Sequence, residues 1–321
     1  MSKILILGKI PPPIGGVTVH VSRLIEWLSE RNFNKFEFCD IKKRSAFYIF
    51  LKILQCRSIH LHISNPYIQL LFAIFCKITF KKLLLTYHGN WGRYGYSKNI
   101  AVNLSACLAY IPIVQNEESL VKAKWWNRNT VLISTFIRSK RIKPLHKELS
   151  DKILHIRKAC RMLFCTNAWN LTFDKEGKEI YGILDIVLKI ANTPGAGLVI
   201  SDPSGNYQPY VKRHCPGITA NIIFISENHD FRNVLALSDA FIRNTTTDGV
   251  SLSIHEAIEK NVVVLASDVV RRPAMCRLYT DFSKVNLEEE LHEGRQNLNS
   301  SAGSGSGPDT LEMLMQLYNR I

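Results

Sequence analysis

The sequence lacks the features that mark exported and membrane-spanning proteins. Its eight cysteines include no Cys-x-x-Cys pair, and several lie in apolar runs, where a thiol behaves as a small hydrophobic side chain. We therefore expect reduced cysteines and a cytoplasmic location. The N-terminus has neither the long apolar region nor the cleavage site of a signal peptide. The most apolar stretch, residues 67–80, contains Gln69 and Lys77 and is shorter than the roughly 20 residues of a spanning helix, so we expect a core helix.

Acidic residues are scarce in the first half of the chain. Residues 1–150 carry 7 Asp or Glu against 23 Lys or Arg, a net charge of +16, whereas the rest is close to neutral. This surplus indicates a basic unit that meets an anionic partner: nucleic acid, acidic lipid or a phosphorylated substrate. The alternative is a basic surface that serves solubility alone. Because no zinc-finger, aromatic strand or recognition-helix pattern accompanies the charge, no nucleic acid is expected.

The length of 321 residues predicts about two domains. A content of 46% hydrophobic and 21% charged residues is typical of a folded chain. Apolar β-rich runs alternate with helical periodicity, which predicts parallel sheets covered on both faces. We therefore expect an α/β protein of two tandem Rossmann-like, doubly wound domains, residues 1–142 and 143–300. Residues 301–321 follow as a flexible Gly/Ser hinge and a terminal helix that could pack back on the N-terminal domain.

The segment Arg243–Pro273 holds the strongest functional signal. It places Asp248 in a loop, starts a helix near Val250 and puts Glu256 inside that helix. The free N–H groups and positive dipole end of a helix suit a diphosphate or sugar hydroxyls, and Glu256 is expected about two turns further along, facing the same cleft. The alternative is an ordinary capped helix with Asp248 or Ser251 as its cap and a solvated Glu256. The candidate donor-binding residues around the helix start are Gly249, Val250, Ser251 and Leu252.

This segment resembles the donor-site signature of the retaining nucleotide-sugar glycosyltransferases of family 4, which have the GT-B fold. There an acid-x7-Glu pair is followed by Glu-Ala, a buried strand and Ser-Asp. The matching residues are Asp248, Glu256-Ala257, residues 262–266 and Ser267-Asp268. A bacterial polysaccharide subgroup (O-antigen or capsule synthesis) is the most similar, through Arg243, Thr245, Asp248-Gly249 and Arg272-Pro273. The resemblance implies that Asp248, in place of the usual Glu, and Glu256 are catalytic-site residues.

The resemblance covers nearly the whole chain. Gly15 and Gly16 match the family's first glycine loop and would let a diphosphate or acceptor approach the backbone, although a tight turn also explains them. No G-x-G-x-x-G dinucleotide motif occurs there. His88 matches the family's His-Gly after an N-domain strand, which implies that it faces the reacting sugar. The alternative is a loop histidine bonded to backbone. For His60 and His62 we expect a core or sheet-surface role rather than metal binding.

The chain departs from the family where cations usually clamp the donor phosphates. Asn167-Ala168 stands in place of Gly-Arg, and Tyr181-Gly182 in place of Lys-Gly. Lys175, Lys178 and Arg243 are the candidates that replace them. No two aspartates are two residues apart, so the Asp-x-Asp metal site of the other major glycosyltransferase architecture is absent and catalysis without a metal or other cofactor is expected. Ser226 is a further, loosely matched donor contact.

These observations predict a hexosyltransferase that uses a nucleotide sugar, with UDP favoured over GDP, and a lipid-diphosphate-linked glycan as acceptor. The basic N-terminal domain is expected to hold the acceptor and to lie on the inner face of the plasma membrane. Lys42, Lys43 and Arg44, beside residues 46–54, are the expected lipid contact; the alternative is a solvated charge run next to a core helix. A sugar-nucleotide epimerase with the same two-domain architecture and a basic nucleic-acid-binding protein are the alternative functions.

Overall fold

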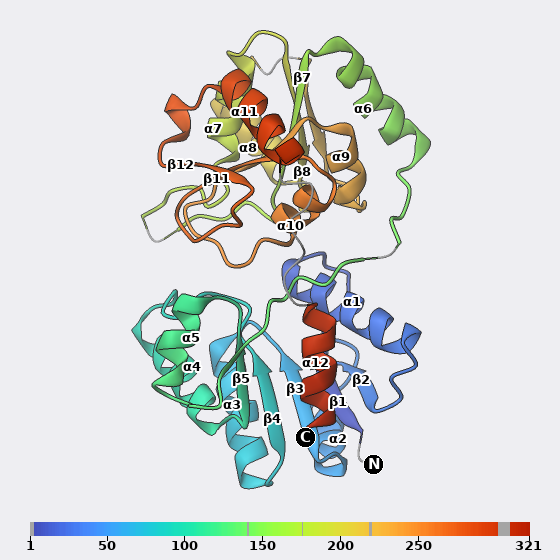
Figure 1. The fold of residues 1–321 in the computed structure, drawn as a ribbon, viewed down its shortest axis with the longest axis vertical. Coiled ribbons are helices and arrows are strands. Elements are labelled where there is room, and N and C mark those ends of the chain that lie inside the picture. The colour runs from blue at the N-terminus through green and yellow to red at the C-terminus, as the bar shows by residue number, and fades with distance from the viewer. Residues whose placement is uncertain (1–2, 140, 175, 218–219, 301–308) are drawn as a thin grey trace. The chain divides into compact units, whose positions relative to one another are not determined.

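The computed structural model describes residues 3–139, 141–174, 176–217, 220–300 and 309–321. The chain divides into two compact units, Met1–Arg138 with Ser306–Ile321 (unit 1) and Ser139–Gly305 (unit 2), coloured by sequence in Figure 1. The division falls just before the domain boundary predicted at residue 142. The reason is that Arg232 of unit 2 donates hydrogen bonds to the carbonyl oxygens of Ser139 and Arg141. The predicted hinge at 301–308 lies outside the described residues.

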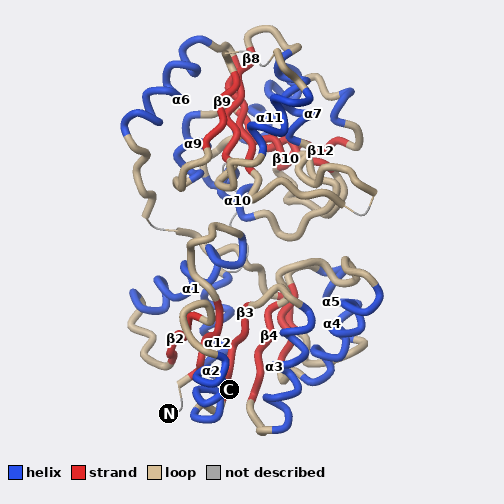
Figure 2. The backbone as a smooth tube through the Cα atoms, turned by 180° about the vertical axis from the view of Figure 1, so that it is seen from behind, coloured by secondary structure: helices blue, strands red, loops and turns tan. Residues whose placement is uncertain are grey.

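Unit 1 is built on a parallel sheet whose strand order is β2-β1-β3-β4-β5-β6. Its strands are β1 (Ile4–Gly8), β2 (Phe36–Asp40), β3 (Ser58–His62), β4 (Lys82–Thr86), β5 (Ile111–Val114) and β6 (Val131–Leu132). Its helices are α1 (Gly16–Glu30), α2 (Ala46–Gln55), α3 (Pro66–Ile78), α4 (Tyr96–Leu108), α5 (Glu117–Lys124) and α12 (Thr310–Asn319). Figure 2 shows the strands of this unit between the helices on its two faces.

Local sequence explains where these helices begin. The Asn65 side chain accepts hydrogen bonds from the N–H groups of Tyr67 (3.0 Å) and Ile68 (3.4 Å), and Pro66 occupies the first helical position of α3, where no N–H is needed. Ser45 caps α2 in the same way through the N–H of Tyr48. Each cap satisfies donors that the first turn leaves without an intrahelical partner.

The two faces of the unit 1 sheet bury different helices. One core joins α2, α3, α4 and α5 to the sheet, and the other joins α1 and α12 to it. The terminal helix α12 therefore belongs to unit 1, through Leu311, Leu314, Leu317 and Tyr318. Tyr318 also shares a hydrogen bond of 2.5 Å with Nδ1 of His60 on β3, which fixes α12 against the centre of the sheet.

Unit 2 repeats the plan with the strand order β12-β11-β10-β7-β8-β9, all parallel. Its strands are β7 (Met162–Asn167), β8 (Ala196–Ser201), β9 (Ile222–Ile225), β10 (Ala240–Arg243), β11 (Val263–Ser267) and β12 (Cys276–Tyr279). Its helices are α6 (Lys147–Ala159), α7 (Ile183–Ala191), α8 (Tyr207–His214), α9 (Phe231–Leu237), α10 (Leu252–Glu259), α11 (Leu287–Ser300) and the 3-10 turn η1 (Phe282–Lys284). Helices α7, α8 and α11 cover one face, and α6, α9 and α10 the other.

The predicted fold class, two doubly wound α/β domains, is confirmed. Residues 147–159 form helix α6, because Leu149, Ile153 and Ile156 recur at helical spacing and pack on unit 2. The stretch 67–80, expected to be a core helix, is buried on one side only: its outer side chains are exposed up to Phe80, at 93%. Among the described residues, no helix combines the length and apolarity needed to cross a membrane.

Candidate functional site

The strand order of unit 2 places its topological switch point between β7 and β10. From β7 the chain continues to β8 and β9 on one side, and from β10 it continues to β11 and β12 on the other. Open α/β sheets bind ligands at the point where the strand order reverses in this way. Asn167 ends β7 and Arg243 ends β10. Nη1 of Arg243 lies 3.4 Å from the carbonyl oxygen and 3.5 Å from Oδ1 of Asn167. The guanidinium of Arg243 therefore reaches from the end of β10 to the end of β7.

Asp248 is clamped between two arginines. Its oxygens accept hydrogen bonds from Nε (2.9 Å) and Nη2 (3.0 Å) of Arg243 and from Nη1 (2.8 Å) of Arg272. Burial alone would raise the pKa of Asp248, but the charges and hydrogen bonds of Arg243 and Arg272 outweigh it and hold the pKa below its usual value. The cluster thus contains two positive charges and one negative charge at neutral pH.

Helix α10 begins beside this cluster. Its N-cap Ser251 makes no side-chain capping bond, so the first-turn N–H groups are not covered by that hydroxyl. Nδ2 of Asn167 donates to Oγ of Ser253 (2.7 Å) and ties the start of the helix to the end of β7. Gly249 donates its N–H to Asp248 (3.0 Å). Because α10 starts at Leu252 rather than near Val250, Glu256 lies about one turn into the helix instead of the predicted two.

Glu256 is buried, with 7% of its surface exposed. It lies within electrostatic range of Arg232 on α9. Burial lowers the pKa of Arg232, whereas the hydrogen bond and charge of Asp230, and then the charge of Glu256, raise it above its usual value. The alternative of a solvated Glu256 is therefore wrong. The predicted acid pair separates into a loop carboxylate, Asp248, and a helix carboxylate, Glu256, with different cationic neighbours.

The two places where the family's cations are missing both adjoin Arg243. Asn167 touches its Nη1, and the ring of Tyr181 lies 5.0 Å from its guanidinium carbon. Gly182 follows in the left-handed region (φ +55°), with the backbone of Asn244 packed against its Cα. The sequence predicted a role for Arg243, but it did not predict that Tyr181 contacts Arg243 or that Arg272 holds Asp248. The signal for both was weak, because each lies far from Arg243 in the sequence.

The remaining donor-site candidates of unit 2 are peripheral to this cluster. Lys178 is exposed. Two residues further along, the carbonyl oxygen of Ile180 accepts a hydrogen bond from the N–H of Thr246 (3.0 Å). Ser226 is exposed just beyond the carboxyl end of β9. Lys175 lies outside the described residues. Val250 is half-buried and Ser251 is buried in the loop before α10.

In unit 1, four histidine rings gather at the corresponding strand ends. His62 ends β3, His88 follows β4, and His20 lies on α1, which follows β1. Nδ1 of His62 and Nε2 of His88 are 3.2 Å apart, and the ring centres of His20 and His62 are 5.0 Å apart. His60 lies behind them, its ring centre 4.1 Å from that of His62. His60 and His62 are buried, as their predicted core role requires. The sequence did not predict that His62 contacts His88.

Burial keeps these histidines neutral. It lowers the pKa of His20 to about 4 and that of His60 to about 3, and together with the neighbouring rings it lowers the pKa of His62 and His88 well below the usual value. Nδ1 of His20 donates to the carbonyl oxygen of Thr135 (2.7 Å), which fixes its tautomer. Among the described residues, no group of three or more His, Cys, Asp or Glu is arranged to hold a metal ion.

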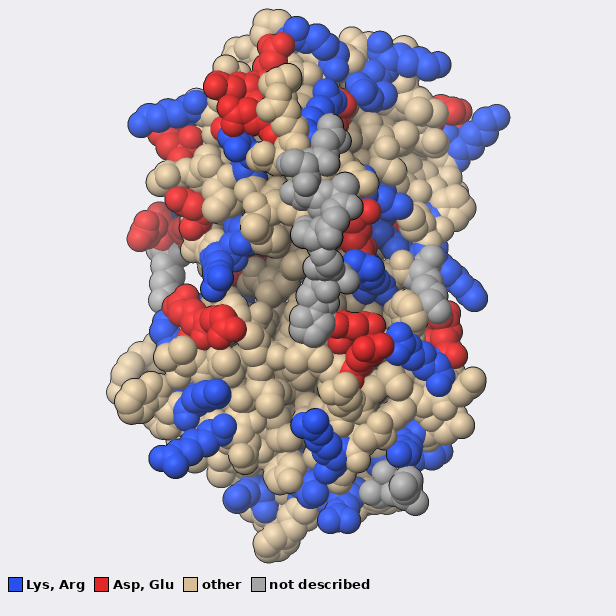
Figure 3. Space-filling model, in the orientation of Figure 1, with Lys and Arg blue, Asp and Glu red and all other residues tan. Residues whose placement is uncertain are grey.

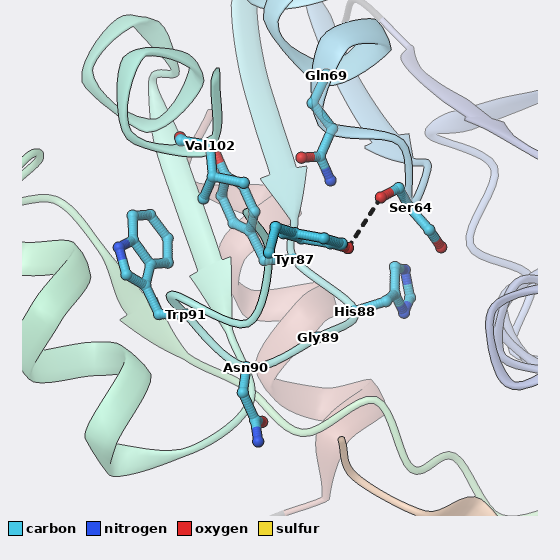
Figure 4. Close-up of a pocket in the computed structure, with 9 residues that line it drawn as sticks. Ser64, Gln69, Tyr87, His88, Gly89, Asn90, Trp91 and Val102 are labelled. Carbon is cyan, nitrogen blue, oxygen red and sulfur yellow. Dashed lines mark hydrogen bonds between the residues drawn. The ribbon is translucent and has the colours of Figure 1, made fainter. Parts of the chain in front are cut away.

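His88 also borders a small pocket that opens to solvent (Figure 4). In Figure 4 the side chain of Gln69 points toward the space beside His88, whereas the hydroxyl of Tyr87 is directed away from it, to Ser105 and Val102 on α4. None of the lining residues is charged. Oε1 of Gln69 is buried without a hydrogen-bond partner among the described residues. Such a pocket suits a neutral ligand that can donate a hydrogen bond.

The other predicted residues of unit 1 lie at its surface. Gly15 caps α1 and Gly16 begins it, and a side chain added at either would meet open space, so neither glycine is required by packing. Lys42, Lys43 and Arg44 are exposed before α2. The lower end of Figure 3, which belongs to unit 1, shows Lys and Arg and no Asp or Glu.

Comparison with known proteins gives a fold. HepE from Anabaena, solved in complex with UDP-glucose, superposes with a TM-score of 0.70 at 14% identity, over 100% of this chain and 99% of its own. Sucrose-phosphate synthase from Thermosynechococcus elongatus gives 0.68 at 14% identity, over 99% and 98%. The chain has the GT-B fold. A putative UDP-N-acetylglucosamine 2-epimerase from Listeria monocytogenes is also similar (0.60, 14% identity, over 98% and 95%).

Comparison by sequence finds no match: no protein-family model and no curated protein matches the chain.

The switch points of the two sheets carry different chemistry. Unit 2 offers an arginine beside the start of a helix, which suits phosphate oxygens, whereas unit 1 offers neutral histidines and a small uncharged pocket, which suit a polar but uncharged group.

Proposed function

We propose that this protein is a retaining glycosyltransferase that moves a hexose from a nucleotide sugar, with UDP as the favoured nucleotide, to a lipid-linked oligosaccharide in bacterial polysaccharide synthesis. The observation that carries the proposal is Arg243 at the switch point of unit 2, beside the start of α10. The shared fold with HepE, solved with UDP and with UDP-glucose, supports the choice of donor.

In the proposed reaction, the bond between the sugar C1 and the β-phosphate oxygen breaks. A new bond forms between C1 and the acceptor oxygen on the same face of the sugar, and the acceptor's hydroxyl proton passes to the departing diphosphate. Arg243 and the first-turn N–H groups of α10 stabilise the charge that develops on the diphosphate.

Calorimetry with UDP and GDP, each with and without added divalent metal, tests the donor site. Saturable binding of one nucleotide, weakened by Glu256→Ala and unchanged by Glu259→Ala, is the expected result, since Glu259 lies on the same helix but is exposed. Binding of neither nucleotide would refute the proposal. Retention is tested separately by the anomer of the sugar released from the donor, read by NMR before mutarotation; the α-anomer is expected from an α-linked donor.

An epimerase is the second candidate, favoured by the similarity to the putative Listeria enzyme. An epimerase would interconvert UDP-N-acetylglucosamine and its C2 epimer in the absence of any acceptor. Incubation with this nucleotide sugar followed by NMR of the intact sugar nucleotide distinguishes the two functions, because a transferase leaves the C2 configuration unchanged.

We further propose that unit 1 lies on an anionic membrane through helices α2, α3 and α4. Residues 41–116 contain ten Lys or Arg and no Asp or Glu. Helices α3 and α4 pack together, and Phe50 joins α2 to α3 through contacts with Phe72 and Phe75. The exposed apolar residues of this face are Phe47, Leu51, Leu54, Tyr67, Ile68, Leu71, Ile74, Ile78, Phe80, Ile100 and Leu104.

The spacing of these residues gives each helix one apolar outer stripe, as in Tyr67, Leu71, Ile74 and Ile78 of α3. A patch of this extent on a soluble surface marks a contact with another apolar phase. The surrounding cations favour anionic lipid, at about 1 kcal/mol each, and would repel a second copy of the same face.

Flotation with vesicles of phosphatidylglycerol and phosphatidylcholine tests this surface. Leu71→Ser with Ile78→Ser is expected to reduce vesicle binding severalfold, while Leu188→Ser, an exposed leucine on α7 of unit 2, should leave it unchanged. Equal binding by both variants, or binding insensitive to phosphatidylglycerol content, would remove this face from the proposal.

A further inference from the structure

Every hydrogen-bonding position on the Asp248 carboxylate is taken within unit 2. Oδ1 accepts from Nη2 of Arg243 and from the N–H of Gly249, both at 3.0 Å. Oδ2 accepts from Nε of Arg243 (2.9 Å) and Nη1 of Arg272 (2.8 Å). A carboxylate offers about four acceptor positions. In this arrangement Asp248 has none left for the hydroxyl of a donor sugar.

Arg272 acts as an internal brace. Besides its bond to Asp248, it donates from Nε to the carbonyl oxygen of Ser267 and from Nη2 to Oγ1 of Thr245, both at 3.1 Å. Only 2% of its side chain is exposed. Each of its three nitrogens donates to the protein and its side chain is buried, so it fixes Asp248 from behind and is not exposed to a ligand.

Arg243 differs because one of its edges is weakly engaged. Nε and Nη2 form a two-pronged pair with Asp248, but the distances from Nη1 to Asn167, 3.4 and 3.5 Å, are at the outer limit of a hydrogen bond. This edge lies at the carboxyl ends of β7 and β10, and Tyr181 contacts the guanidinium through its ring and through a side-chain hydrogen bond. Two arginines against one carboxylate leave a net positive charge there.

We propose that Asp248 is a positioning residue and that Arg243, held by it, binds the donor diphosphate. The inference rests on the proposed function. It places the phosphate-binding charge on Arg243, which touches both Asn167 and Tyr181, the positions at which this chain lacks a cation. A short carboxylate five residues after Arg243 reaches back to it within the same loop. A guanidinium matches phosphate oxygens better than sugar hydroxyls, since the pairing is charge-assisted.

The two roles of Asp248 make different predictions for ligands that lack a sugar. A carboxylate that binds the sugar contributes nothing to UDP, whereas one that positions Arg243 contributes to UDP but little to UMP, which has no β-phosphate. The experiment is calorimetry of UDP and UMP, or GDP and GMP if guanine is the base, on wild type, Asp248→Asn and Arg243→Gln. Asp151→Asn, an exposed acid on α6, is the matched control.

We expect Asp248→Asn and Arg243→Gln each to weaken UDP binding about tenfold or more, the scale of one charge-assisted hydrogen bond, with UMP binding changed far less. The double variant should bind UDP no more weakly than Arg243→Gln alone, because Asp248 acts through Arg243. Thermal unfolding shows which variants fold. Arg243→Lys keeps the positive charge but loses the two-pronged guanidinium. It should also lose the tighter binding of UDP relative to UMP.

A wild-type preference for UDP over UMP in Asp248→Asn would overturn the inference while leaving the proposed donor site intact. So would an additive loss in the double variant. If wild type binds neither UDP nor GDP, the proposed function fails and the inference fails with it, so the two failures are told apart by the wild-type protein alone.

Discussion

Mild acid is expected to unfold unit 1, because its core contains histidines that are neutral only when buried. His20, His60 and His62 are at most 1% exposed, and burial puts the pKa of His20 at about 4 and of His60 at about 3. In the unfolded chain these rings titrate near their ordinary pKa of about 6.5. Below that pH the unfolded state binds more protons than the folded state, so the free energy of unfolding falls as the pH falls.

The size of the effect follows from the two pKa values. Each ring with a folded pKa of 4 or lower removes about 1.4 kcal/mol per pH unit below 6.5, or about 2 kcal/mol at pH 5. His20 and His60 together remove about 4 kcal/mol at pH 5, a large part of the stability of a typical domain. His62 acts in the same direction, because burial and the neighbouring rings lower its pKa well below the usual value. The loss continues down to about pH 4 for His20 and pH 3 for His60.

Guanidinium titrations between pH 7.5 and pH 5, followed by tryptophan fluorescence, measure this loss. Four of the five tryptophans (Trp27, Trp91, Trp125 and Trp126) belong to unit 1, so the signal reports mainly on that unit. His62→Asn should flatten the pH dependence by up to one proton, whatever it does to stability at pH 7.5. A wild-type free energy of unfolding that is constant from pH 7.5 to pH 5, or an unchanged slope in His62→Asn, would refute the reasoning.

Two further substitutions test contacts that position the strand-end residues. Tyr318→Phe removes the hydroxyl bonded to His60 and is expected to lower the free energy of unfolding of unit 1 by about 1–3 kcal/mol, measured in the same titrations; no loss would mean that α12 is held by its apolar contacts alone. Gly182→Ala is expected to destabilise unit 2 by more than about 1 kcal/mol in thermal unfolding, because the residue has φ +55° and a Cβ there would lie 2.6 Å from the carbonyl oxygen of Asn244. An unchanged melting temperature would contradict the strain at this turn.

The spacing of apolar residues determined most of the fold. The central strands of both sheets were predictable because buried parallel strands read as short, continuous apolar runs. The edge strands β2, β6 and β12 were not predicted: β6 is two residues long, and edge strands carry mixed side chains that resemble loops. The exposed stripe of α3 was misread as core, since an apolar sequence does not say which of its faces meets protein and which meets another apolar phase.

The residues of the proposed donor site were predictable from local order along the chain, because Arg243, Asp248 and Glu256 lie within one strand, loop and helix. The tertiary structure alone decided their relations. Arg272 reaches Asp248 from beyond the next strand, and Tyr181 reaches Arg243 from before α7. The sheet order likewise brought His20, His62 and His88 together from three strand ends. Sequence fixes which groups are available, but hydrogen bonds and burial depend on which elements the sheet places side by side, and that is set by packing of the whole unit.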